Sequence, residues 1–221
     1  MDMKITIPTQ LADITLGQYQ KYLKLLEAND DADAKTSQFF KVKIIEIFCE
    51  IPHIDLHKMK ISDINEINEV IYSALEQEAE LVETFKMGDQ EFGFIPKLDD
   101  MLFGEYIDLD TYIGDWEKMN IAMSVLYRPI TAKKGKKYLI EDYRGDNYHD
   151  IMKQMPLNAV FGSIVFFYHL GIDCTKGMMT YLETTDNPTE LEKVLDKNGV
   201  GISRYTHLLK EILDDLKVSL N

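Results

Sequence analysis

Residues 81–96 read LVETFKMGDQEFGFIP, and this stretch decides the fold class because it interrupts a chain whose other periodic segments are helical. Two runs, residues 81–86 and 91–95, flank the sequence MGDQ, in which Gly88 supplies the residue that a tight turn needs. Pro96 ends the second run, since proline cannot donate a hydrogen bond to a sheet. We therefore predict a β-hairpin near 81–95.

Apolar residues at helical spacing lie on both sides of the hairpin. Thr15 and Gln18 form the pattern of a capping box and predict a helix from residue 16 to about 28. Ser62 is expected to cap another helix, and Gly171 is expected to end one as a C-terminal glycine. The expected helices cover residues 16–28, 34–50, 54–59, 62–75, 102–113, 115–127, 157–170, 175–183 and 202–220. A further helix is expected to start at Pro188, after Asn187 as its cap.

These elements predict a mainly α fold of the α+β class. It is a multi-helix bundle with one β-hairpin near 81–95 and short extended segments near 4–7 and 138–141. A chain of 221 residues can bury a substantial core in one large domain. We predict a main helical domain over residues 1–186. Residues 187–221 form a C-terminal helical pair, which packs on that domain or serves as a contact arm.

Charge and hydropathy exclude several classes of partner. The chain carries 24 basic and 38 acidic residues, a net charge of -14, which opposes nucleic-acid binding because phosphate contacts need clustered cations. The same surface favours basic partners. The longest apolar stretch, residues 159–170, is too short to span a bilayer. The start of the chain lacks the pattern of a signal peptide, and two widely spaced cysteines indicate a reducing compartment.

Each pattern that could carry catalysis fails at a named position. His53 and His57 have the spacing of two zinc ligands on a helix, but Ile54 stands where a zinc protease needs its glutamate. Asp108 and Asp110 begin the spacing of a calcium loop, which Tyr112 then breaks. There is no Walker A loop and no nucleophile elbow. We expect no enzymatic activity, no cofactor and no metal.

Two features are candidates for contact with a partner. One is the basic stretch 131–137, predicted to be an exposed loop, whose lysines could dock an acidic partner or could simply form a solvated hairpin tip. The other is Trp116, the single tryptophan, which starts a helix and is either part of the core or an interface anchor. The candidate contact residues are Lys133, Lys134, Lys136, Lys137 and Trp116.

A resemblance to a known group rests on the motifs FGEYIDL at residues 103–109 and LYRP at residues 126–129. The chain resembles small proteins of tailed bacteriophages in which an F-G-E-[FY]-I-D-L helix precedes a helix that ends in L-Y-R-P. Its opening, ITIP at residues 5–8 and DITLGQY at residues 13–19, is similar to the start of those chains. The resemblance covers roughly residues 3–170, and its motifs are structural rather than catalytic.

The resemblance implies a role in phage morphogenesis, since such proteins are generally encoded among virion and tail-assembly genes. The chain would be a minor virion component of the tail, neck or interior, or a chaperone of tail assembly. It would bind tail, neck or portal-vertex proteins or copies of itself, in the host cytoplasm during assembly or in the virion. Two alternatives from other classes are an acidic module that inhibits a host protein and a metal-dependent hydrolase that uses His53 and His57.

Overall fold

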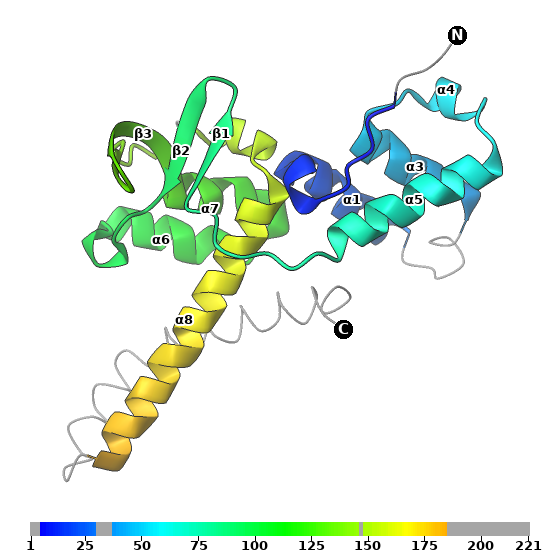
Figure 1. Cartoon of the computed structure of the whole chain (residues 1–221). Helices are drawn as coiled ribbons and strands as arrows, with labels where there is room; N and C mark the ends of the chain where they lie inside the picture. The colour runs from blue at the N-terminus through cyan, green and yellow to red at the C-terminus, as the bar shows by residue number, and fades with distance from the viewer. Residues whose placement is uncertain (1–4, 30–36, 146–147, 185–221) are drawn as a thin grey trace.

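The computed structural model describes residues 5–29, 37–145 and 148–184 (Figure 1). Within them the chain has the predicted α+β fold, in which helices accompany a four-stranded antiparallel sheet. The helices are α1 (Leu16–Ala28), α3 (Gln38–Cys49), α4 (His53–Leu56), α5 (Ile61–Leu75), α6 (Phe103–Tyr112), α7 (Met119–Leu126) and α8 (Leu157–Thr184). In Figure 1, α1, α3, α4 and α5 lie together on one side, and the sheet, α6 and α7 lie on the other.

The helix starts follow the local sequence closely. Thr15 caps α1 as predicted, since its hydroxyl accepts a hydrogen bond from the Gln18 backbone N–H at 3.2 Å. The Gln18 side chain returns the contact by accepting from the Thr15 N–H at 2.9 Å. Residues 34–36, at the predicted start of the second helix, lie outside the described residues. The cap predicted at Ser62 is wrong by two positions, because α5 starts at Ile61 and Lys60 is its N-cap.

The predicted hairpin is confirmed and belongs to a larger sheet. Strands β1 (Thr84–Met87) and β2 (Gln90–Phe94) pair through a two-residue turn in which Gly88 has a φ of 57°. The sheet continues in the order β1-β2-β3-β4 with β3 (Tyr127–Lys134) and β4 (Lys137–Ile140). The extended segment predicted near 138–141 is therefore strand β4.

The basic stretch 131–137 is not the loop that we expected. Its first half lies in β3, and its second half passes through a turn at Gly135, with a φ of 61°, into β4. Arg128-Pro129 stops helix α7, as proline predicts, but the chain enters a strand at once. The Pro129 carbonyl accepts a hydrogen bond from the Glu141 N–H at 2.9 Å, and Glu141 lies just past the end of β4. The N–H that proline lacks would point to this same place, so its absence costs no hydrogen bond within the β3–β4 ladder.

The two sides of the molecule are joined where the N-terminal segment meets the start of α8. The Leu157 N–H donates to the Ile14 carbonyl at 2.8 Å, and the Leu16 N–H donates to the Met155 carbonyl at 2.9 Å. Leu16, Ile14 and Leu157 are fully buried, and the buried apolar residues of both sides form one continuous cluster. This shared core holds the N-terminal helices against the sheet side.

Helix α8 departs from the sequence expectation at its middle. Gly171 does not end it: the helix spans 28 residues and merges the two helices that we predicted over 157–170 and 175–183. An internal glycine costs a helix only about 1 kcal/mol, and Gly171 is buried, so packing outweighs its weak propensity. No helix among the described residues is long and apolar enough to cross a membrane.

The two ends of the chain add little to the described fold. Residues 5–7 form no strand, and Lys4 lies outside the described residues, so the extended segment near 4–7 is not part of the sheet. The predicted helical pair over 187–221 also lies outside the described residues.

Candidate functional site

Helix α6 exposes several large apolar side chains, although its Leu109 is buried. Phe103, Tyr106 and Ile107 lie at positions i, i+3 and i+4, which places them on one face, and Phe103 is 81% exposed. Leu102, at the N-cap, is also exposed beside them. We call Leu102, Phe103, Tyr106 and Ile107 the α6 face. Apolar residues on a surface helix normally turn inward, as Leu109 of α6 does, so this second, exposed apolar face is unusual.

The opposite side of α6 carries a buried carboxylate. Glu105 is only 2% exposed, and its Oε1 lies 2.5 Å from Nη1 of Arg128 on β3, which is 6% exposed. The other oxygen, Oε2, accepts a hydrogen bond from the Leu102 backbone N–H at 2.6 Å. Each charge compensates the other where water cannot, so the pair fixes the start of α6 to the sheet.

A tyrosine supports this ion pair from the side. The guanidinium carbon of Arg128 lies 5.9 Å from the centre of the Tyr143 ring. The Tyr143 hydroxyl donates a hydrogen bond to Oδ2 of Asp108 on α6 at 2.5 Å. Burial, and then the hydrogen bond to Asp108, raise the pKa of Tyr143, so the hydroxyl keeps the proton that it donates. Helix α6 is thus held at two points, Glu105 and Asp108.

An open groove of about 1200 Å³ runs beside β4 and reaches the α6 face at Leu102. Strand β4 and the residues that flank it, 136–143, form one side. Leu139 on that side is 65% exposed. The apolar lining comes from β2, β4, α8 and the connecting segments and includes Leu81, Phe94, Ile95, Leu98, Leu102, Leu139, Ile140 and Phe166. A concave, largely apolar surface of this kind suits a protein segment.

The four candidate lysines gather at the β3–β4 turn, and one of them is neutralised. Lys133 Nζ lies 2.5 Å from Oε1 of Glu91 on β2. Lys134, Lys136 and Lys137 are exposed, and the described part of the chain offers them no ion pair. Lys136 and Lys137 line the groove, so the structure brings two of the four predicted residues to the same place as the α6 face.

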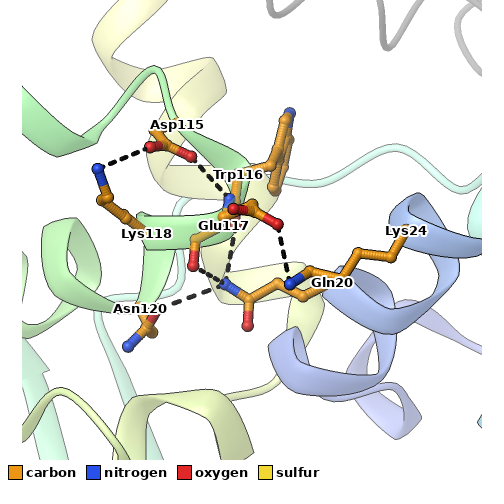
Figure 2. Close-up of polar contacts among 7 residues, drawn as sticks. All are labelled: Gln20, Lys24, Asp115, Trp116, Glu117, Lys118 and Asn120. Atoms are coloured by element: carbon orange, nitrogen blue, oxygen red, sulfur yellow. Dashed lines mark hydrogen bonds and ion pairs between the residues drawn. The ribbon is translucent and has the colours of Figure 1, made fainter. Parts of the chain in front are cut away.

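Trp116 lies in a different part of the molecule (Figure 2). Its ring is half-buried, with its centroid 5.2 Å from that of Tyr19 in an edge-on arrangement and 6.0 Å from that of Phe161. The Gln20 side-chain amide donates to the Trp116 carbonyl at 2.8 Å, as Figure 2 shows. Trp116 does not line the groove. Its contacts serve to pack α1 against the segment that leads into α7.

The residues considered for catalysis do not form a centre in the described part of the chain. Nε2 of His53 and Nε2 of His57 lie 2.8 Å apart, and Oε2 of Glu46 lies 3.9 Å from His53 Nδ1. In residues 5–29, 37–145 and 148–184, no three histidine, cysteine or acidic side chains are placed to share a metal. Burial raises the pKa of the Cys49 thiol to about 11, which makes it a poor nucleophile near neutral pH.

The exposure of the α6 face was not predicted from the sequence. The helix was predicted, but a helical pattern rich in apolar residues is normally assigned with its apolar side inward. The usable signal was Glu105, which lies two positions after Phe103 and two before Ile107 and therefore points away from both on the helix. Only the partner of Glu105, Arg128, decides which side is buried, and it lies on another element.

Comparison of this chain with protein-family models, with curated proteins and with solved structures gives no match.

Proposed function

We propose that this chain acts without catalysis, by binding other proteins through the α6 face during the assembly of a tailed bacteriophage. The observation that carries the proposal is the exposure of Leu102, Phe103, Tyr106 and Ile107 on one helix. Contact between clustered apolar side chains and water is unfavourable in free energy. On a folded protein such a patch therefore marks a surface that a partner covers.

The support beneath the face favours a specific partner. Glu105 and Asp108 tie α6 to Arg128 and Tyr143, so the face is presented in one arrangement before binding. A preformed surface has less conformational entropy to lose on association. Phe103 and Tyr106 are large aromatic side chains, the kind that anchors interfaces.

The proposal names a phage because of the sequence resemblance. The geometry suggests what the two motifs of that resemblance do in this fold. The motif at residues 103–109 contains the α6 face and Glu105, and the motif at residues 126–129 contains Arg128. The two motifs therefore meet in the buried ion pair that orients the face. A chain that keeps both motifs keeps the means to present this helix with its apolar side outward.

A second candidate, an acidic regulator of a host protein, draws on the net charge of -14. The two candidates differ in partner and in salt response. Binding through the α6 face is apolar and tolerates salt, whereas binding through the acidic surface weakens as ionic strength rises.

The test uses the full chain with an affinity tag, expressed in cells that produce the phage encoding it. A variant with F103A, Y106A and I107A is compared with a matched control, F39A, I54A and I61A, which removes equally exposed apolar residues from the N-terminal helices. We expect tail, neck or portal proteins to co-purify with the wild type and the control. The α6 variant should recover at least about tenfold less, since truncated interface anchors cost 2 kcal/mol or more.

Two results would contradict the proposal. One is equal recovery of the same partners by the α6 variant, with circular dichroism showing that all proteins are folded. The other is recovery of a host protein alone, lost at about 0.5 M salt, which would favour the regulator. Mass spectrometry of purified virions then separates the two roles: a stoichiometric amount of the chain indicates a structural component, and absence indicates a chaperone.

A further inference from the structure

Strand β4 is an edge of the sheet. It pairs with β3 on one side, and within the described residues no strand lies on its other side. The Glu141 N–H points toward β3, where it donates to the Pro129 carbonyl. Backbone groups alternate in direction along an antiparallel strand, so the N–H and C=O groups of Tyr138 and Ile140 face outward. Such an edge can take another strand.

The sequence along this edge is complementary to itself when reversed. Residues 136–142 read KKYLIED: two cations, three apolar residues and two anions, with Leu139 at the centre. In an antiparallel pair centred on Leu139, Lys137 of one strand faces Glu141 of the other. Lys136, in the turn before β4, and Asp142, just past its end, bring further opposite charges to the same two ends. Parallel pairing in register would instead oppose like charges at both ends.

We propose that two copies of this chain pair antiparallel through β4, about a twofold axis at Leu139, so that their sheets join into one. The inference goes beyond the proposed function: it adds a second copy of the chain as a partner and places it on the β4 edge rather than on the α6 face. In a twofold dimer both copies use the same surface patch, so that patch must be complementary to itself. The sequence of the β4 edge meets this condition.

The backbone geometry agrees with this register. Tyr138 of one copy faces Ile140 of the other, and these are the residues whose backbone groups point outward, so each such pair exchanges two hydrogen bonds. Leu139 then faces Leu139 in a pair without hydrogen bonds, where side chains approach most closely. Leu139 is 65% exposed in the single chain and would be covered by its own copy.

The charges at the ends of the edge are available for this contact. In the part of the chain that the structure describes, Lys136, Lys137 and Asp142 form no ion pair and no side-chain hydrogen bond. Glu141 accepts a hydrogen bond from the Tyr148 hydroxyl on Oε2, which leaves Oε1 free. Residues 136–143 line the groove of about 1200 Å³, so the edge adjoins open space that a second strand can enter.

The decisive experiment is a charge exchange in the full-length chain, followed by sedimentation velocity. The wild type should form dimers. K136E/K137E and E141K/D142K should each dimerise at least about tenfold more weakly, because each opposes like charges at both ends of the paired strands. An equimolar mixture of the two variants should restore a dimer, since the acid-only edge then meets the lysine-only edge. A dimer that persists in both variants, or a mixture that stays monomeric, would overturn the proposal.

A cross-link checks the register at the centre. In a chain with C49S and C174S, L139C should form an intermolecular disulfide under mild oxidation, because residues facing each other at a pair without hydrogen bonds suit a disulfide. I54C, equally exposed on α4, is the matched control and should stay largely monomeric. Equal cross-linking of both would contradict the register. A wild type that sediments only as a monomer overturns this dimer and leaves the co-purification test of the α6 face unaffected.

Discussion

Gly162 on α8 and Glu80 lie in direct backbone contact. A Cβ atom on Gly162 would stand 2.0 Å from the carbonyl oxygen of Glu80 and 2.6 Å from its carbonyl carbon. The segment that leads from α5 to β1 therefore crosses α8 at a point where only glycine leaves room. This crossing sets the distance between α8 and the sheet side of the molecule.

Replacing Gly162 with alanine should destabilise the fold. The backbone of Glu80 cannot rotate away as a side chain could, so we expect a loss of about 2–4 kcal/mol in the free energy of unfolding, measured by urea titration. Gly104→Ala is the matched control, because a Cβ at Gly104 meets nothing within 4 Å and Gly104 lies in helix α6. It should be neutral or stabilising by up to about 1 kcal/mol. Equal stability of the two variants would contradict the crossing.

Gly93 on β2 makes room for the ring of Tyr138. A Cβ there would lie 2.5 Å from Tyr138 Cε2, and the ring is held in place because its hydroxyl donates to the Phe94 carbonyl at 2.8 Å. Gly93→Ala should cost about 1–3 kcal/mol by overpacking. In the background of Tyr138→Ala the same change should cost at least about 1 kcal/mol less, as a double-mutant cycle by thermal denaturation would show. Additive effects would mean that the ring moves aside freely.

Removing one member of the buried ion pair should be more harmful than removing both charges. Arg128→Met leaves the Glu105 carboxylate buried without its cation, which should cost about 3–5 kcal/mol. Glu105→Gln combined with Arg128→Met removes both charges and keeps an acceptor for the Leu102 N–H. We expect this double variant to be at least about 1 kcal/mol more stable than Arg128→Met alone in chemical denaturation. A double variant less stable than Arg128→Met would show that the carboxylate needs no cation.

The Cys49 thiol should react slowly in the folded chain. Its pKa is raised to about 11 by burial, so at pH 8 only about one thiol in a thousand is ionised, against roughly one in four for an ordinary cysteine. In a C174S background, iodoacetamide should therefore label Cys49 on the order of 100-fold more slowly than it labels free cysteine, allowing for the thiolate fraction alone. The rate should rise about tenfold per pH unit up to pH 10. Labelling in urea is the control and should match free cysteine; rapid labelling of the folded chain at pH 8 would refute the raised pKa.

Helix starts and tight turns could be predicted from the sequence because the residues that fix them lie close together in the chain. The capping box at Thr15 and Gln18 and the turn at Gly88 act over three or four residues, and both are found where the sequence predicts them. The end of α7 before Pro129 is local in the same way. The predicted helix end at Gly171 was wrong because the local preference is weak: a single glycine costs a helix only about 1 kcal/mol, and α8 continues through it.

Strand β3 was missed because its pairing is non-local, although the segment near 138–141 that became β4 was predicted. Strand β3 begins directly after α7 and pairs Pro129 with Phe92, far back in the chain. Strand β3 reads YRPITAKK, and its proline and final lysines are residues that strands disfavour. Its partners β2 and β4 supply the hydrogen bonds that define it.

The sequence by itself determined the helix content, the first hairpin, the charge and the positions of the residues on α6. Only the tertiary structure decided which side of α6 faces out, and with it the candidate binding surface. The physical reasons are the ion pair between Glu105 and Arg128 and the burial of Leu109 on the same side of the helix. A carboxylate can be buried when a cation from another element compensates it, and that compensation turns Phe103, Tyr106 and Ile107 toward the solvent.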